Sequence, residues 1–190
     1  MKTVIFLMLI MFFQCFPVNK INFHEDIKQD SNWKVYSFYK GKYPEAVVNP
    51  NIKRTIRIVD IPNGVNTIAF IKNDNDKCLF YNVFLLKRIN NWFKVAVFSY
   101  NSDNIVAMGW INKRAIGIYL KNYTRNLYLY KEPSLDSEII VSIPEYIPDL
   151  VYIEDYEELW LKIRIEDSNN VLTGWIPYEM QCANALSTCS

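Results

Sequence analysis

Glycine, histidine and net charge are all scarce in this 190-residue chain. There are only 5 glycines, while aromatic residues make up 15% of the chain, including 13 tyrosines and 11 phenylalanines. This composition favours half-buried strands over long helices. The formal net charge is +1 and charged residues make up 22%, so no electrostatic field points to nucleic acid or to an acidic substrate. We therefore expect an all-β protein that does not bind nucleic acid.

Catalytic and metal-binding patterns are scarce as well. The single histidine, His24, precedes every strand of the repeat described below, whereas a histidine-dependent cysteine or serine nucleophile needs the imidazole beside it. The sequence has no glycine-rich phosphate loop and no Cys-x-x-Cys pair. The acidic stretch "IEDYEELW", with Glu154, Asp155, Glu157 and Glu158, predicts a solvated turn rather than a glycosidase pair, and "KNDNDK" predicts a turn rather than a calcium loop. We expect no enzyme activity, no metal and no cofactor.

The N-terminal segment carries the longest uncharged apolar run. A charged start followed by the run from Val4 to Phe13 fits a secretory signal over residues 1–20, and this run is too short to span a bilayer of about 30 Å. A buried core strand is the alternative. Cys15 stands where a lipoprotein cysteine would, although the residues before it lack the small side chain that such processing prefers. We expect an extracytoplasmic protein, periplasmic or secreted, that contacts a membrane only if Cys15 is lipidated.

The other three cysteines divide into a close pair and a single residue. Cys182 and Cys189 lie near each other behind a signal segment, which favours a disulfide between them; two free thiols are the alternative. So short a ring would pin the C-terminal tail rather than hold the fold. Cys78 is left over, and we expect it to pack as a small apolar residue.

The chain contains one pattern twice, separated by loops of unequal length. The first pair of segments is "IRIVDIPNG" (56–64) and "LYLYKEPSL" (127–135), in which Ile56, Ile58 and Pro62 match Leu127, Leu129 and Pro133. Three more pairs follow in the same order: "IAFIKND" (68–74) with "IIVSIPE" (139–145), "NWFKVAV" (91–97) with "LWLKIRI" (159–165), and "MGWINK" (108–113) with "TGWIPY" (173–178). Since loops tolerate changes in length, we interpret the pattern as a duplication, with "NDNDKCLFYNVFLLKRIN" as an insertion in the first copy.

Each copy is expected to form about five short strands, which can bend into a small barrel that closes most of its edges. The strands of the second copy are predicted at Leu127–Lys131, Ile139–Ile143, Leu150–Glu154, Leu159–Ile165 and Leu172–Pro177. The turn-forming "EDSNN" joins the last two in a hairpin. The glycine of each Gly-Trp pair fits a strand position where another backbone approaches closely or where a bulge is needed. A polar lead-in precedes the first copy, with a possible strand at Trp33–Tyr39.

The order of strand, proline loop, Trp-x-Lys strand, turn and Gly-Trp-Ile strand resembles the bacterial SH3-like (SH3b) family. The first copy carries it in "TIRIVDIPNG", "NWFKV" and "MGWI", and the second in "NLYLYKEPS", "LWLKI" and "TGWI". The tail "MQCANALSTC" is similar to the cysteine-bearing ending of some secreted SH3-like proteins of Bacteroidetes-type bacteria. The resemblance implies two small five-stranded SH3-like barrels in tandem after a signal peptide. The expected parts are the signal peptide at 1–20, a lead-in at 21–44, a first SH3-like domain at 45–120, and a second at 124–190 with the disulfide tail.

The resemblance also implies a ligand groove between the proline loop and the loop before the Trp-x-Lys strand. Exposed aromatic rings there can stack on sugars, proline or peptide backbone. The candidates in the second copy are Tyr128, Tyr130, Tyr152, Tyr156, Trp160 and Tyr178, with Trp175 nearby. Side chains alternate along a strand, so Leu161, Ile163 and Ile165 are expected in the core, and Trp160, Lys162 and Arg164 on the outer face. The alternative is that Trp160 and Trp175 belong largely to the core.

These observations predict a non-catalytic, exported binding module of the cell envelope that recognises peptidoglycan or an envelope partner protein. A purely structural tandem-barrel protein with no dedicated ligand is the alternative. The SH3-like family often flanks cell-wall cysteine endopeptidases, but no such catalytic domain fits in this length. A cell-wall hydrolase is therefore the least favoured function.

Overall fold

The structure, a computed structural model, describes residues 35–100, 105–123, 126–167, 170–184, 186 and 189. The predicted signal segment, Cys15 and His24 lie outside the described residues. Within these ranges the chain is all-β, apart from a helical turn at residues 35–39 and two short 3-10 helices. No helix in this described part is long and apolar enough to cross a membrane.

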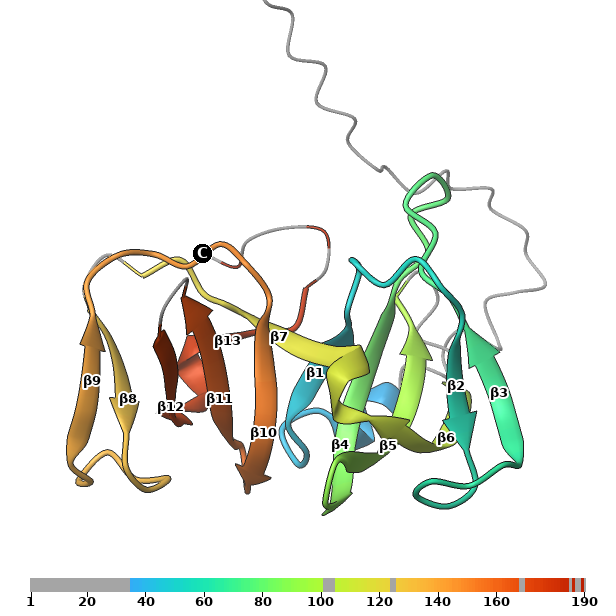
Figure 1. Cartoon of the computed structure of the whole chain (residues 1–190), viewed down its shortest axis with the longest axis horizontal. Helices are drawn as coiled ribbons and strands as arrows, with labels where there is room; N and C mark the ends of the chain where they lie inside the picture. Colours follow the sequence, from blue (N-terminus) through green and yellow to red (C-terminus); the bar gives the residue numbers. More distant parts are fainter. Residues whose placement is uncertain are drawn as a thin grey trace, which may run out of the picture.

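The elements of the second half repeat those of the first half in order (Figure 1). The first half consists of β1 (Glu45–Val48), β2 (Ile56–Val59), β3 (Thr67–Ile71), β4 (Tyr81–Ile89), β5 (Trp92–Ser99), β6 (Ile105–Asn112), η1 (Lys113–Ala115) and β7 (Ile116–Leu120). The second half consists of β8 (Leu127–Tyr130), β9 (Ile139–Ile143), β10 (Val151–Glu157), β11 (Trp160–Asp167), β12 (Asn170–Ile176), η2 (Tyr178–Met180) and β13 (Gln181–Cys182). The strands predicted for the second copy are all present, and β11 and β12 form the predicted hairpin.

The strands form one 13-stranded sheet in the order β3-β2-β6-β5-β4-β1-β7-β10-β11-β12-β8-β9, with β13 paired to β7. All pairings between these strands are antiparallel. Read outward from the centre, β4-β5-β6-β2-β3 on one side corresponds to β10-β11-β12-β8-β9 on the other. In Figure 1 these two groups lie on opposite sides of β1 and β7. Hydrogen bonding therefore runs continuously from one half into the other through β1 and β7.

The register of the strands repeats along with their order. Trp110 lies opposite Val59 and Lys94 in the first half. Trp175 lies opposite Tyr130 and Lys162 in the second. The glycine before each of these tryptophans lies close to the backbone of a neighbouring strand. A Cβ atom added to Gly109 would lie 2.8 Å from the Val59 carbonyl oxygen, and one added to Gly174 would lie 3.2 Å from the Tyr130 carbonyl oxygen. The close backbone approach predicted for the Gly-Trp motif is confirmed.

The irregularities of the sheet repeat as well. The β4–β5 pairing shifts register between Leu85 and Lys87, and the β10–β11 pairing shifts between Ile153 and Asp155. Strand β4 is thus the counterpart of β10, although the sequence analysis assigned residues 81–89 to an insertion. That assignment is wrong, because Leu85 pairs with Val95 just as Ile153 pairs with Ile163. The extra length of the first half lies in the loop before β4, where residues 75–78 form the predicted turn.

The main hydrophobic core draws on both halves and consists of inward-facing strand residues. Leu161, Ile163 and Ile165 are buried in it as predicted, and so are Leu127 and Leu129. This alternation places the side chains between them on the outer face of the sheet. The strand periodicity alone was therefore sufficient to identify the core side of β8 and β11.

A second, smaller cluster lies around Phe84 and Phe98, on the outer face of β4 and β5, and residues 35–43 cover it. The strand predicted at Trp33–Tyr39 is wrong for residues 35–39, which are helical; Trp33 lies outside the described residues. Residues three apart on a helix share one face, and Tyr36 and Tyr39 place their rings 5.2 and 5.5 Å from the Phe84 ring. Burial of both tyrosines against the sheet favours helix over the strand propensity of this stretch.

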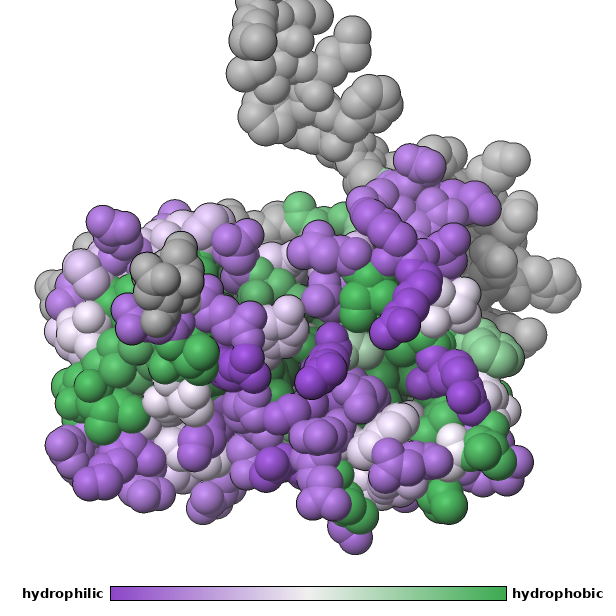
Figure 2. Space-filling model, in the orientation of Figure 1, coloured by the Kyte–Doolittle hydropathy of each residue, from purple (hydrophilic) through white to green (hydrophobic). Residues whose placement is uncertain are grey.

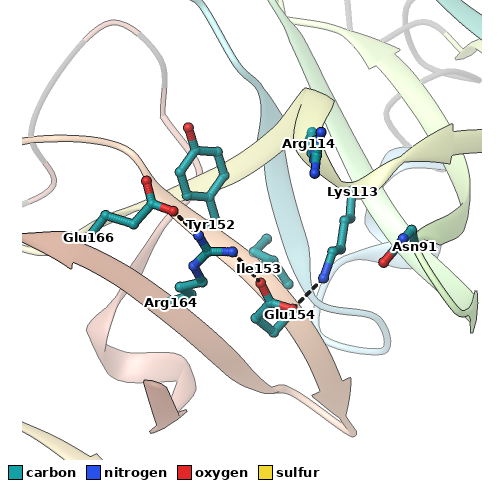
Figure 3. A pocket seen from close by; sticks show the side chains of 8 residues that line it. All are labelled: Asn91, Lys113, Arg114, Tyr152, Ile153, Glu154, Arg164 and Glu166. Atoms are coloured by element: carbon teal, nitrogen blue, oxygen red, sulfur yellow. Dashed lines mark hydrogen bonds and ion pairs between the residues drawn. The ribbon is translucent and has the colours of Figure 1, made fainter. Parts of the chain in front are cut away.

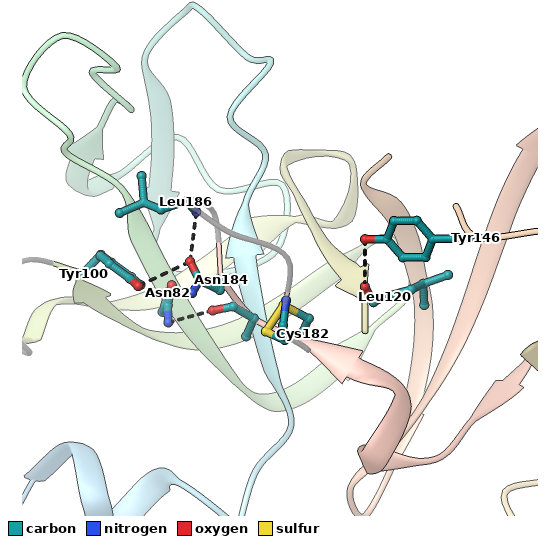
Figure 4. The surroundings of a disulfide bond; sticks show 9 residues. Asn82, Tyr100, Leu120, Tyr146, Cys182, Asn184 and Leu186 are labelled. Atoms are coloured by element: carbon teal, nitrogen blue, oxygen red, sulfur yellow. Dashed lines mark hydrogen bonds between the residues drawn. A yellow bond between two sulfur atoms is a disulfide. The ribbon is translucent and has the colours of Figure 1, made fainter. Parts of the chain in front are cut away.

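The C-terminal tail crosses back to the first half (Figure 4). Cys182 and Cys189 form the predicted disulfide, with Cα atoms 5.7 Å apart. Strand β13 pairs with β7, and the side chain of Tyr100 donates a hydrogen bond of 3.3 Å to Asn184 Oδ1. A disulfide is compatible with an extracytoplasmic location. The tail therefore ties the second half to the first, rather than closing the second half on itself.

The structure differs from the prediction that Cys78 packs as a small apolar residue. Cys78 is disulfide-bonded, and no cysteine in the described part of the chain is a free thiol. It lies half-buried in the turn before β4 rather than in the core cluster. The expectation that it packs as an unpaired small apolar residue is therefore wrong.

Candidate functional site

Four aromatic side chains share the outer face of β8, β12 and β11. Tyr130 and Trp160 are in contact, with ring centroids 5.6 Å apart and ring planes at 89°. Trp175 lies directly opposite Tyr130 on the neighbouring strand. Tyr128, two residues before Tyr130, points to the same side because side chains alternate along β8. We call Tyr128, Tyr130, Trp160 and Trp175 the aromatic face.

The members of the aromatic face differ in exposure. Trp175 is buried at 7% exposure, and the Lys162 Nζ atom lies 5.8 Å from its ring centroid. Trp160 and Tyr130 are half-buried, and Tyr128 is 39% exposed. Trp175 therefore supports the face from beneath, while the other three rings are open to a ligand. Aromatic rings held in this way can stack on a sugar or on peptide backbone.

The remaining candidates lie elsewhere. Tyr156 places its ring 6.2 Å from the ring of Phe93 in the first half and packs against the core cluster. Burial raises the pKa of its phenol, as do the charge of Asp155 and the neighbouring Tyr43. The register shift after Ile153 explains why Tyr156 faces the core and not the predicted groove, because one extra residue turns the following side chains to the opposite face of the sheet. Tyr156 is therefore a core residue at the contact between the halves, not part of the predicted groove.

Tyr152 and Tyr178 are also separated from the aromatic face. Tyr152 lies opposite Arg164 and lines a charged hollow between the halves. Tyr178 begins the short helix η2 after β12 and is half-buried. The structure thus brings together Tyr128, Tyr130 and Trp160, as the sequence analysis expected, and places the other tyrosine candidates at separate positions.

The charged hollow has a volume of about 380 Å³ and lies where η1 of the first half meets β10 and β11 (Figure 3). Glu154 forms ion pairs with Lys113 of η1 and, at 3.8 Å, with Arg164 of β11. Arg164 also pairs with Glu166. Lys113 and Arg164 each have a carboxylate partner, so their ion pairs join the two halves electrostatically. Arg114 also lines the hollow, and it forms no ion pair within the described residues.

The acidic stretch "IEDYEELW" (153–160) does not form the solvated turn that the sequence analysis predicted. Glu154, Asp155 and Glu157 lie on strand β10 instead of in a solvated turn. Asp155 pairs with Arg88 of β4 at 2.6 Å, which adds a second ion pair between the halves. Only Glu158 stands in the turn between β10 and β11, where its φ is 50°. Glu154 and Asp155 are therefore structural contacts between the halves, whereas Glu157 and Glu158 are exposed.

A second hollow of about 410 Å³ lies in the first half beside Trp92, and sequence analysis missed it. It is lined mainly by Arg54, Arg57, Arg114, Trp92, Thr55 and Asn112. The repeat was the available signal, since it aligns Trp92 with Trp160 and Arg57 with Tyr128. The two halves therefore present related surfaces with different chemistry: aromatic in the second half and arginine-rich in the first.

Comparisons with known proteins add little to this description. No protein-family model and no curated protein matches the sequence. Two solved structures from Trichomonas vaginalis share 15% identity with the chain at a TM-score of 0.33: NlpC1, over 73% of this chain and 45% of that one, and NlpC2, over 76% and 49%. The chain spans about half the length of either structure. At this TM-score the likeness does not establish a common fold. No cluster of His, Cys, Asp or Glu able to hold a metal was found in the described ranges.

Proposed function

We propose that the protein is a non-catalytic binding module of the cell envelope and that its aromatic face binds peptidoglycan. The observation that supports this most directly is the contact between Tyr130 and Trp160 beside the exposed Tyr128. Rings that pack on each other are already ordered before a ligand arrives, which lowers the conformational entropy lost on binding. A sugar ring can then stack on the open faces of Tyr128 and Trp160.

The charge beside the aromatic face suits the peptide stems of peptidoglycan. Lys162 extends over Trp175 at the centre of the face. An ammonium group next to stacking rings can pair with a stem carboxylate while the rings hold the adjoining sugar. Sugar stacking and carboxylate pairing together distinguish peptidoglycan from a neutral polysaccharide.

The proposed architecture is a tandem of two SH3-like units that share one sheet. The repeated strand order, the repeated register and the repeated bulges support two equivalent units. The proposed location is the periplasm or the cell exterior, reached through the signal segment at residues 1–20, and the disulfides are compatible with it.

Co-sedimentation with purified sacculi tests the proposal. We expect the wild-type protein to sediment, and Trp160→Ala and Tyr128→Ala each to weaken binding by about tenfold, equivalent to about 1.4 kcal/mol. Phe70→Ala is the matched control, because Phe70 is an aromatic residue on β3 that is 67% exposed and lies far along the sheet from the aromatic face. A wild-type protein that stays in the supernatant would contradict the proposal, as would an equal loss in all three variants.

Binding of a partner protein is the second candidate, and the two edge strands favour it. Strand β3 exposes Ile68 and Phe70, and β9 exposes Ile139 and Ile140. Figure 2 shows hydrophobic residues gathered at the left edge of the molecule, where β8 and β9 lie. An apolar edge strand can accept an added strand from another protein. For this function, Phe70→Ala or Ile139→Asp would weaken capture of the partner while binding to sacculi stays unchanged.

A further inference from the structure

The arginine hollow beside Trp92 differs from the charged hollow in its balance of charge. Arg54, Arg57 and Arg114 line it, and none of its lining residues is acidic. Ion pairs in the described ranges involve Arg88 and Arg164, but none of these three arginines. The arginines of the described ranges that have no carboxylate partner, Arg54, Arg57 and Arg114, thus all line this one hollow. An anion entering it would meet guanidinium groups that need not first break an existing ion pair.

Two of the groups in the hollow are held in position by hydrogen bonds. Arg57 donates from Nε to Thr67 Oγ1 at 2.9 Å and from Nη2 to the Val65 carbonyl at 2.6 Å. Its Nη1 group is left to bind a ligand. The indole of Trp92 donates from Nε1 to Asn63 Oδ1 at 3.0 Å, which fixes the orientation of the ring. A positioned guanidinium beside a positioned indole provides both a charge and a flat apolar surface.

Neutral polar groups complete the lining. Thr55 contributes a hydroxyl. The side-chain oxygen of Asn112 accepts a hydrogen bond of 3.1 Å from the Arg114 backbone N–H, so its NH2 group remains a donor. Hydroxyl and amide groups around an aromatic ring are the partners that sugar hydroxyls require. The lining therefore combines an anion clamp, a stacking surface and donors for hydroxyl groups.

We propose that this hollow binds an acidic saccharide, a sugar ring that carries a carboxylate or a phosphate. The anionic group lies against Arg57 and Arg114, and the sugar ring lies on Trp92. A volume of about 410 Å³ accommodates one or two sugar rings. The site is distinct from the aromatic face of the second half and does not depend on that face binding peptidoglycan. A net charge of only +1 argues against a nucleic acid ligand, which needs a wider basic surface.

Calorimetric titration of the full-length protein tests the proposal. The probes are hexagalacturonate for the carboxylate source, glucose 6-phosphate for the phosphate source, and maltohexaose as the neutral saccharide. We expect hexagalacturonate or glucose 6-phosphate to bind with one site per chain and an affinity that falls as salt is raised, and maltohexaose not to bind. Arg57→Gln and Arg114→Gln should each weaken the acidic saccharide by about tenfold.

Arg88→Gln is the matched control, since it removes the same charge at a site outside the hollow. Trp92→Leu should weaken hexagalacturonate but leave binding of inorganic phosphate unchanged, because phosphate has no ring to stack. If Trp92→Leu does not fold, the arginine variants carry the test alone. The proposal is overturned if no acidic saccharide binds, if Arg88→Gln weakens binding as much as the hollow variants, or if hexaglutamate binds more tightly than hexagalacturonate.

Discussion

The Asn82 side chain donates a hydrogen bond of 3.2 Å to the backbone carbonyl of Ala183, which joins strand β4 of the first half to the C-terminal tail (Figure 4). The backbone N–H of Asn122 similarly donates to the Cys189 carbonyl at 2.9 Å. The tail is thus bound at both ends of the disulfide ring to residues outside the second half. The stability of each half is therefore coupled to the other.

Removal of the Cys182–Cys189 disulfide should destabilise the whole chain. The Cys182→Ser/Cys189→Ser variant is expected to lower the free energy of unfolding by about 2.5 kcal/mol, from loss of the loop constraint on the unfolded state. Urea unfolding followed by tryptophan fluorescence measures the change. Ser187→Ala in the same ring is the control. An unchanged midpoint in the double variant would show that the tail contributes nothing to folding.

A chain of residues 124–190 should not unfold cooperatively. It lacks β7, which pairs with β10 at Val151 and with β13 at Cys182, so two strands would lose their partner. A chain of residues 113–190 restores β7 and also Lys113, the ion-pair partner of Glu154. We expect a sharp thermal transition by circular dichroism for the longer chain only. A sharp transition in both would identify 124–190 as an independent domain.

The two faces of β11 should respond differently to truncation of their side chains. Leu161 and Ile163 are fully buried, and replacing either by alanine should cost about 3 kcal/mol through lost transfer energy and a remaining cavity. Trp160 is half-buried on the outer face, so Trp160→Ala should cost less. Equilibrium unfolding of the three variants gives the order. If Trp160→Ala is the most destabilising, the ring is a structural component of the core.

Tyr156 should make stability sensitive to alkaline pH. Burial raises the pKa of its phenol above the ordinary value of 10.0, with added effects from Asp155 and Tyr43. The folded protein therefore holds this proton more tightly than the unfolded chain, and the resulting stability is complete below pH of about 10 and is lost as the pH rises through the folded-state pKa.

Tyr156→Phe should accordingly flatten the fall in unfolding free energy above pH of about 10, because phenylalanine does not ionise. Urea unfolding at a series of pH values measures the slope. Phe70→Leu, at an exposed aromatic residue of β3 that has no ionisable group, is the control and should leave the slope unchanged. An equal effect of the two variants would show that burial of Tyr156 does not govern this pH dependence.

Local patterns in the sequence were sufficient for much of the fold. The alternation of Leu127 with Tyr128, and of Leu161 with Lys162, identified the core side of two strands, because a strand has only two faces. The order of the repeated motifs identified the equivalence of β2, β3, β5 and β6 with β8, β9, β11 and β12, but not that of β4 with β10. The close spacing of Cys182 and Cys189 identified the disulfide. All of these features depend on neighbours within a few residues or on a pattern that is repeated intact.

The features that sequence analysis missed depend on partners far away in the chain. Tyr156 faces the core because the pairing with β11 shifts register after Ile153, and no residue near Tyr156 encodes that shift. Residues 35–39 are helical because Tyr36 and Tyr39 both pack on strands more than 40 positions later.

The sequence by itself determined the all-β class, the repeated strands and the inward-facing residues, since each follows from local periodicity. Only the tertiary structure decided that β1 and β7 join the halves into one sheet and that Arg54, Arg57 and Arg114 meet beside Trp92. The physical reason is the same in both cases. A strand edge or a guanidinium group can pair with many partners of the same kind, and only packing of the whole chain selects which one it meets.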